Sequence, residues 1–119
     1  MAVVIINELV TEEDLQIAKE DYGDYIKWVA DIGLGILAIG GEYHADAEEV
    51  LMKSGSKQSE LWGGGLDLTT GELDFIALIN IRPGINKNHT IQDQAVRDRV
   101  EKIVHARFPQ SFSRPGPNK

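Results

Sequence analysis

The sequence predicts a small single-domain α+β protein, in which helices pack on one face of a mainly antiparallel sheet. Three observations lead to this prediction. Apolar runs rich in β-branched residues alternate with segments of helical periodicity, in the order β-α-β-α-β-β-α. A length of 119 residues suits one domain with one core. The hydrophobic fraction of 42%, with 26% charged residues, is ordinary for a globular protein.

The chain is expected to begin with a short strand followed by a long helix. Residues 2–6 are apolar and mostly β-branched, which favours a strand. Thr11, with Asp14 three residues later, is typical of a helix start. Apolar residues then recur at helical spacing, and we predict a helix over residues 12–31. Gly23 would lie inside this helix, at a cost of about 1 kcal/mol relative to Ala.

The middle of the chain is expected to contain a buried strand, a short helix and a β-hairpin. Residues 34–39 form an apolar run bounded by glycines, which indicates the buried strand. Asp46 is the expected N-cap of the helix that follows. A glycine-rich strand over residues 61–68 and a strong strand over 73–81 are separated by a turn at 69–72, and they predict the hairpin.

The C-terminal part of the chain is expected to form one more helix and a tail. Thr90, followed by Asp93, indicates the start of an amphipathic helix that continues to about residue 108. Residues 109–119 are rich in proline and polar residues, and we expect them to be disordered. The single domain therefore covers residues 1–108.

Composition and charge narrow the classes of function. The chain has no cysteine, which excludes disulfides and thiolate chemistry. Its net charge of −7 argues against binding to nucleic acid, although a basic patch is an alternative in the second half. That patch would consist of Arg82, Lys87, Arg97 and Arg99. No segment has the features of a targeting sequence or the roughly 20 apolar residues needed to span a bilayer. We therefore expect a soluble, cytoplasmic protein that does not bind a membrane.

The densest group of chemically active side chains lies between the buried strand and the short helix. Glu42, His44 and Asp46 alternate there, and a carboxylate beside a histidine orients the imidazole and raises its pKa, as a general base requires. The three side chains could instead hold a divalent metal. Helix capping already accounts for Asp46, however. We therefore expect a Glu42–His44 pair, with no metal and no other cofactor.

A second polar group follows the strongest predicted strand. Asn80 and Arg82 alternate with isoleucines there, and the guanidinium of arginine suits carboxylates and phosphates. They are either an anion clamp beside Glu42 and His44 or part of an intramolecular salt bridge. Three further residues are candidates for binding a ligand at the same rim, although each also has an ordinary structural interpretation: Gln58, Trp62 and Asn88.

Several motifs taken together resemble a family of short prokaryotic proteins, common in cyanobacteria, that is described as a domain of unknown function. The resemblance covers roughly residues 11–104 and brings no activity, substrate or cofactor with it. This sequence departs from the family after Trp62, where Gly64 and Gly65 precede a compact turn. The motifs are His44-Ala45-Asp46-Ala47-Glu48, Leu61-Trp62-Gly63 and Ile79-Asn80-Ile81-Arg82-Pro83.

Two hypotheses of function follow from these residues. The first is a self-associating binding module that takes a small anionic ligand, with a second apolar strip of Ile17 and Trp28 at the contact between subunits. The second is a hydrolase-like enzyme with His44 as general base and Arg82 as the group that stabilises an anion. The sequence leaves open whether the protein is an enzyme. The enzyme hypothesis requires His44 and Arg82 to share one cleft.

Overall fold

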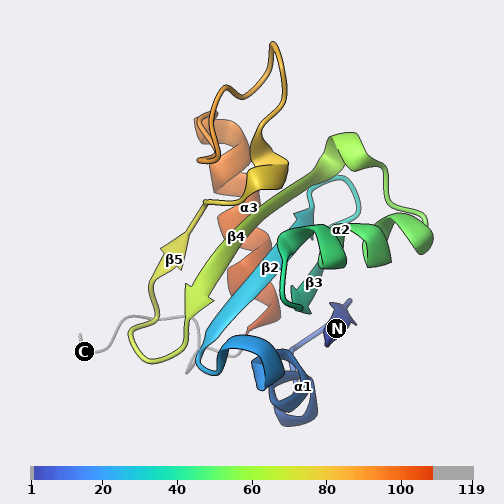
Figure 1. The fold of residues 1–119 in the computed structure, drawn as a ribbon, viewed down its shortest axis with the longest axis vertical. Helices are drawn as coiled ribbons and strands as arrows, with labels where there is room; N and C mark the ends of the chain where they lie inside the picture. Colours follow the sequence, from blue (N-terminus) through green and yellow to red (C-terminus); the bar gives the residue numbers. More distant parts are fainter. Residues whose placement is uncertain (1, 109–119) are drawn as a thin grey trace.

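The computed structural model describes residues 2–108, which form one five-stranded sheet with the strand order β1-β3-β2-β4-β5. All neighbouring strands are antiparallel. Figure 1 shows the arrangement of the elements. In chain order they are β1 (Val3–Ile6), α1 (Glu12–Tyr22), β2 (Tyr25–Asp31), β3 (Ile36–Gly40), α2 (His44–Lys53), the 3₁₀ turn η1 (Gln58–Glu60), β4 (Leu61–Asp67), β5 (Leu73–Asp74), the 3₁₀ turn η2 (Leu78–Asn80) and α3 (Gln94–Arg107).

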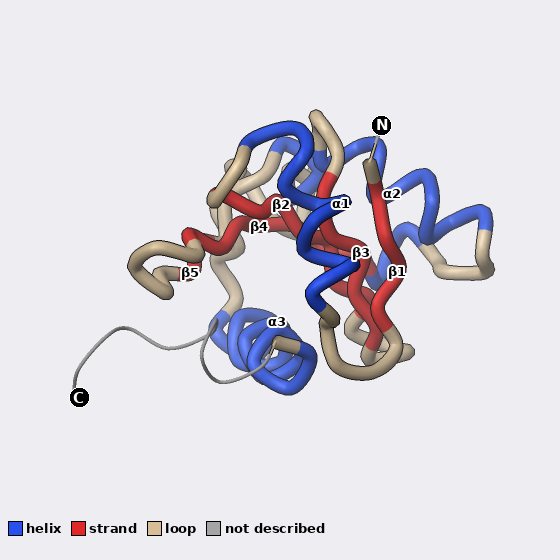
Figure 2. Tube along the Cα trace, turned by 90° about the horizontal axis from the view of Figure 1, so that it is seen from below, coloured by secondary structure: helices blue, strands red, loops and turns tan. Residues whose placement is uncertain are grey.

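The structure confirms the α+β class and the antiparallel sheet, but the helices cover both faces of it. The side chains of β2 alternate between the faces, as strand geometry requires. Trp28 belongs to the larger core, which α1 and α3 cover, whereas Val29 belongs to a smaller core beneath α2. In Figure 2 the sheet separates α3 from α2. The prediction that the helices lie on one face is therefore correct for α1 and α3 and wrong for α2.

The predicted helix over residues 12–31 is a helix followed by a strand. The predicted start is confirmed, because Thr11 and Asp14 form reciprocal hydrogen bonds between side chain and backbone. Gly23 ends the helix with a φ of +63°, a conformation that glycine adopts readily. Tyr25–Asp31 then forms β2. Trp28 is fully buried there, so the apolar strip that Trp28 and Ile17 were expected to share does not exist.

The two later helices start at positions that differ from the predicted ones. In α2, Asp46 lies in the first turn instead of at the N-cap, and its carboxylate accepts a hydrogen bond from the amide of Tyr43 at 3.0 Å. In α3, Asp93 is the N-cap, and its carboxylate accepts from Ala95 and Val96. Thr90 is not part of that helix. Both carboxylates accept hydrogen bonds at the start of a helix, as expected. Asp46 does so from the first turn instead of the N-cap, and Asp93 is the N-cap in place of Thr90.

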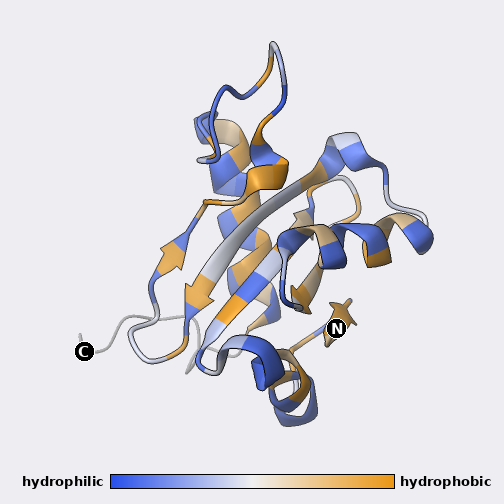
Figure 3. Ribbon diagram, viewed as in Figure 1, coloured by the Kyte–Doolittle hydropathy of each residue, from blue (hydrophilic) through white to orange (hydrophobic). Residues whose placement is uncertain are grey.

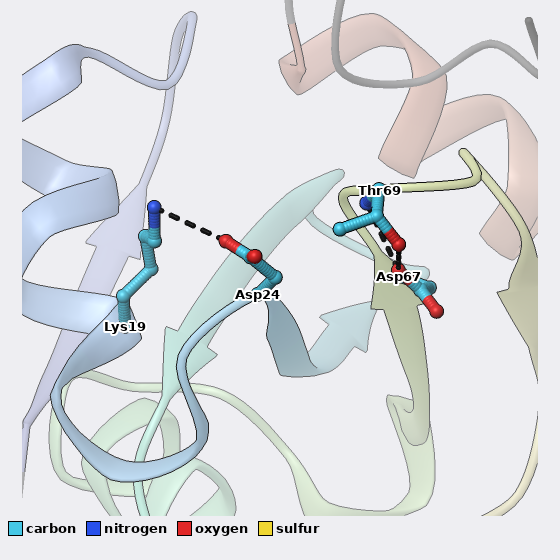
Figure 4. Close-up of polar contacts among 4 residues, drawn as sticks. All are labelled: Lys19, Asp24, Asp67 and Thr69. Atoms are coloured by element: carbon cyan, nitrogen blue, oxygen red, sulfur yellow. Dashed lines mark hydrogen bonds and ion pairs between the residues drawn. The ribbon is translucent and has the colours of Figure 1, made fainter.

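The predicted hairpin is confirmed, but its second strand is short. Only Leu73–Asp74 pairs with β4, and the chain then leaves the sheet through η2. The turn is held by Asp67, whose carboxylate accepts from the amide and the hydroxyl of Thr69 at 2.9 and 2.6 Å. These hydrogen bonds lower the pKa of Asp67. Figure 4 shows this turn beside the Lys19–Asp24 ion pair, 3.2 Å long, at the end of α1.

Two expectations concern membrane-spanning helices and the C-terminal tail. None of the helices in the described residues has the length and the apolar content to span a membrane. The expected disordered tail, residues 109–119, lies outside the described residues.

Figure 3 shows that β4 contains a pale, glycine-rich stretch close to the apolar residues of η2. This glycine-rich stretch forms the base of the candidate site.

Candidate functional site

A cleft of about 400 Å³ lies on the α2 face of the sheet. It is formed where the start of α2 meets β2 and the segment that includes η2 (Figure 1). Most of its surface is apolar, and the exposed side chains of Ile76 and Leu78 form part of its wall. We call it the His44 cleft. Nine residues line it: Lys27, Tyr43, His44, Ala45, Ile76, Ala77, Leu78, Ile79 and His89.

The glycine run of β4 allows four side chains to lie close to that strand. A methyl group at Gly63 would lie 2.8 Å from Cβ of Ala77 and 3.0 Å from Cδ2 of His44. A methyl group at Gly64 would collide with Trp28, and one at Gly65 with the ring of Tyr25. Glycine within a strand often marks a β-bulge or a close approach of neighbouring groups. Close approach accounts for these three glycines.

His44 is anchored to β4 through one edge of its imidazole ring. Its Nε2 lies 2.7 Å from the carbonyl oxygen of Gly64, and a carbonyl can only accept, so Nε2 carries the hydrogen. Cδ2, on the same ring edge, faces Gly63. In a five-membered ring Nδ1 lies opposite this edge and points away from the strand. No residue within 2–108 forms a hydrogen bond with Nδ1, and Nδ1 is not among the buried atoms that lack a partner.

The surroundings of His44 favour its neutral form. Burial lowers the pKa of His44 below its ordinary value, and the ammonium group of Lys27 lowers it further. The hydrogen bond to Gly64 and the charge of Asp74 act in the opposite direction but do not outweigh burial. With Nε2 protonated, a neutral imidazole has a lone pair on Nδ1. The cleft therefore contains one hydrogen-bond acceptor that no described residue satisfies.

Lys27 brings a positive charge into the cleft without an acidic partner. Its Nζ donates to the backbone carbonyl of Glu42 at 2.6 Å. The ammonium lies 4.2 Å from the ring centre of Tyr22 and 5.7 Å from that of Tyr43, distances at which cations attract aromatic rings. The ion pairs found among the described residues do not include Lys27. Two aromatic rings and one carbonyl therefore hold an ammonium that can still bind an anion.

The expected pair of Glu42 and His44 does not form through their side chains. Glu42 is exposed, and the contact it provides at the cleft is its backbone carbonyl. Its carboxylate makes no hydrogen bond with the imidazole in the described structure, where the partner of His44 is Gly64. The physical reason is that α2 begins at His44, so the strand alternation that would align the two side chains ends before it.

Asn80 stabilises the outer edge of β4 instead of lining the cleft. It is fully buried, and its Oδ1 accepts from the amide of Gly63 at 2.8 Å. Its Nδ2 donates to the carbonyls of Gly63, Phe75 and His89 at 3.0, 3.1 and 3.0 Å. Every polar atom of the side chain is thus satisfied by backbone groups. This leaves Asn80 no free group with which to bind a ligand.

Arg82 lies in a different cleft from His44. Its guanidinium stacks over the ring of Trp62, with 4.1 Å between Cζ and the ring centre. It donates to the carbonyl of Ser59 at 3.1 Å and also to that of Leu61. Burial lowers the pKa of Arg82. The structure therefore does not bring Arg82 and Asn80 together with His44.

The remaining candidates lie near Arg82 or in turns. Gln58 lines the cleft of Arg82, about 360 Å³ in volume, and its amide donates to Glu48 at 3.3 Å. Trp62 is nearly buried beneath Arg82. Asn88 is exposed, and its Oδ1 accepts from the amide of Thr90 at 2.8 Å, as is usual for asparagine in a turn. None of these three residues lines the His44 cleft.

A metal site at Glu42, His44 and Asp46 finds no support in the geometry. Within residues 2–108, no three metal-ligating side chains lie close enough together to hold an ion. The carboxylate of Asp46 is used to cap α2. The imidazole of His44 donates to the backbone of β4, so the two side chains serve different hydrogen bonds.

Sequence reasoning missed most of the residues that line the His44 cleft. Lys27 and the two apolar wall residues, Ile76 and Leu78, were assigned to the interiors of a helix and a strand. One feature of the sequence could have identified Lys27. Tyr25–Asp31 is a run of mostly β-forming residues, and its charged members are Lys27 and the final Asp31. His89 lies in a polar loop that could join the same rim, but the sequence favours the ordinary interpretation of its residue type as part of a turn.

Comparison with known proteins supports the family resemblance and adds no function. A family model described as "Protein of unknown function (DUF5674)" matches residues 4–107. No curated protein and no solved structure matches the chain. The matched segment contains every strand and helix of the sheet domain except the first residue of β1. The chain therefore belongs to the DUF5674 family of proteins of unknown function.

Proposed function

We propose that this protein is a binding module whose His44 cleft takes a small, mainly apolar molecule. The observation that carries the proposal is the composition of the cleft. Exposed apolar side chains line it together with an ammonium and an imidazole nitrogen that have unused hydrogen-bonding capacity. Ligand sites are commonly concave and mostly apolar, with a few polar groups that orient the ligand.

The exposure of the cleft wall supports this proposal. The side chain of Leu78 is 77% exposed and that of Ile76 is 46% exposed, although both follow a well-packed hairpin. Asn80 holds this segment against β4 through two hydrogen bonds to Gly63, and its amide also donates to the carbonyls of Phe75 and His89. A rigid segment that keeps apolar side chains in water is typical of a surface that a ligand or partner covers.

The hydrolase-like alternative has weaker support. Of its three groups, only His44 lines the cleft, and it is oriented by the carbonyl of Gly64. Glu42 faces solvent, and the guanidinium of Arg82 is held by Trp62 and two carbonyls. No serine, threonine or carboxylate is among the described residues that line the cleft. Because Arg82 lies elsewhere and no such side chain is available as a nucleophile, His44 is a poor basis for hydrolysis even with Lys27 in the same cleft.

The proposal can be tested by NMR with variants that fill the cleft. Hexanoate, hexanamide and 1-hexanol are titrated into ¹⁵N-labelled protein. At least one of them is expected to shift the amide resonances of His44, Ala77 and Leu78 saturably. Ala45 is exposed at the cleft, so Ala45→Trp should block binding, whereas Ala106→Trp on the exposed side of α3 should not. Absence of saturable shifts, or equal binding by Ala45→Trp, would contradict the proposal.

Self-association, a cytoplasmic location and a cyanobacterial distribution of the family stay proposals. For self-association, the exposed side chains of Leu78, Ile81 and Ile85 now replace Ile17 and Trp28 as the apolar surface that a second copy could cover. Figure 1 shows the loop that follows η2 projecting from the fold. Light scattering at high micromolar concentration is expected to give a dimer mass. A monomer mass would remove this part of the proposal.

A further inference from the structure

The His44 cleft combines one fixed charge with an apolar wall, which restricts the chemistry of its ligand. Lys27 is the one lysine, arginine, aspartate or glutamate among the described residues that line the cleft. An apolar molecule with a single negative group would place its body against Ile76 and Leu78 and its charge at Lys27. A cationic ligand would meet the ammonium without any acidic counterpart in the cleft wall.

We propose that the cleft binds a small apolar monocarboxylate, whose carboxylate pairs with Lys27 and accepts a hydrogen bond from Nδ1 of a protonated His44. This inference rests on the proposed function and names the class of ligand for the same cleft. The proton on Nδ1 comes from solvent when the ligand binds. The lone pair on Nδ1 of a neutral imidazole would repel the carboxylate. Once Nδ1 carries a proton, it donates a charge-assisted hydrogen bond to the carboxylate instead.

The geometry of Lys27 suits this role. Its Nζ uses one hydrogen for the carbonyl of Glu42 and faces the rings of Tyr22 and Tyr43, which attract the cation without neutralising it. An ammonium has three donors, so donors remain for a carboxylate. The rings also restrict the flexible side chain, which reduces the entropy that ordering it would cost on binding.

Proton uptake follows from the groups that face His44. Burial and Lys27 keep the free imidazole neutral by lowering its pKa, whereas Asp74 from β5 acts weakly in the opposite direction. His89 lines the same cleft from the loop before α3, and Tyr43 precedes His44 in the chain. A carboxylate placed in the cleft adds a negative charge next to the imidazole and raises the pKa of His44. Binding should therefore tighten as the pH falls toward the pKa of the free imidazole.

The test compares hexanoate with its neutral analogue hexanamide by ¹⁵N NMR titration. Hexanoate is expected to bind about tenfold more tightly, which is the usual size of one charge-assisted interaction. Lys27→Met should remove this preference, and Lys27→Arg should largely keep it. Lys57→Met, an exposed lysine at another cleft, is the matched control and should behave as the unmodified protein. Imidazole resonances of His44 should show a higher pKa with hexanoate than with hexanamide.

The outcomes separate this inference from the proposed function. If hexanamide binds in the cleft as tightly as hexanoate, or if Lys27→Met leaves the preference intact, the carboxylate inference is overturned and the binding module stands. If the pKa of His44 does not rise with hexanoate, the proposed hydrogen bond is wrong. If hexanoate, hexanamide and 1-hexanol all fail to shift the cleft resonances, the inference and the proposed function both fail.

Discussion

The side-chain amide of Asn80 pairs with both backbone groups of Gly63, with Oδ1 2.8 Å from the amide nitrogen and Nδ2 3.0 Å from the carbonyl oxygen. One side chain thus provides the two hydrogen bonds that a neighbouring strand would give to the outer edge of β4. Arg82 donates to Leu61 two residues earlier on the same edge. These contacts allow η2 to leave the sheet and form a wall of the His44 cleft.

Replacing Asn80 should destabilise the fold strongly. Asn80→Leu keeps the branched shape of the side chain but leaves the amide and the carbonyl of Gly63 without a partner. The carbonyls of Phe75 and His89 lose one donor each and keep the backbone amides that already bind them. Since each unsatisfied buried group costs about 1–3 kcal/mol, we expect the free energy of unfolding to fall by about 4 kcal/mol. Urea denaturation measures the change. The control Asn88→Leu removes one exposed hydrogen bond and should cost about 1 kcal/mol. Equal losses in the two variants would contradict this role of Asn80.

Adding a methyl group to Gly63 should disturb the cleft directly. The new Cβ would lie 2.8 Å from Cβ of Ala77 and 3.0 Å from the ring of His44, and neither neighbour can move without separating η2 or α2 from β4. We expect Gly63→Ala to lower the free energy of unfolding by about 2 kcal/mol, as overpacking usually does, and to shift the imidazole resonances of His44. At Gly33 the nearest atom belongs to the flexible side chain of Glu60, so Gly33→Ala should have a small effect. An unchanged His44 spectrum in Gly63→Ala would contradict the close contact.

The lowered pKa of His44 should make stability depend on pH. The unfolded chain takes up a proton near pH 6.5, the ordinary value for histidine, whereas the folded chain resists protonation until a lower pH. The contribution of this group to stability is therefore fully present above about pH 6.5 and decreases as the pH falls toward the lowered pKa. His44→Gln should remove this part of the pH dependence, and His105→Gln, on the exposed side of α3, should leave it unchanged. Urea denaturation at several pH values below about 6.5 measures this dependence. If the free energy of unfolding of His44→Gln changed with pH as that of the unmodified protein does, the interpretation would be contradicted.

Arg82 should contribute to stability and not to ligand binding. Arg82→Lys removes the planar stacking on Trp62 and at least one of the donors to Ser59 and Leu61, so we expect a loss of about 1–2 kcal/mol. Arg97→Lys is a matched control, because Arg97 stacks on Phe75 at 4.4 Å. It should cost less than 1 kcal/mol, because within residues 2–108 its guanidinium stacks on the ring without donating to backbone carbonyls. The affinity for hexanoate should stay the same in both variants. A loss of affinity in Arg82→Lys alone would return Arg82 to the binding site.

The sequence predicts the parts of this fold that depend on local chemistry. The Thr11–Asp14 capping pair, the apolar strand before Gly40 and the turn between β4 and β5 follow from side chains close together in the chain. The boundary at Gly23 was missed because Tyr25, Ile26 and Val29 satisfy helical spacing, whereas β2 is apolar on both faces and shows no simple alternation. What decides between helix and strand is the burial of Trp28 between β3 and β4, a contact between distant segments.

Only one of the residues expected at the candidate site lines the cleft, because contacts between distant segments determine the rest of its lining. His44 was identified by its residue type, and it lines the cleft. Asn80 and Arg82 were expected to join it because they end an apolar run, but backbone groups of β4 and η1 satisfy both side chains. Lys27 was missed because its proximity to His44 depends on the pairing of β2 with β4 and on the position of α2 above them. Such relationships are not encoded in short motifs.

A crystal structure of the protein grown with saturating hexanoate tests the central claim most directly. We expect the carboxylate to lie within 4 Å of Nζ of Lys27, a salt-bridge distance, with the alkyl chain against Ile76 and Leu78. Hexanoate bound only outside the His44 cleft, or a cleft that stays empty under these conditions, would contradict the claim that the cleft binds a monocarboxylate.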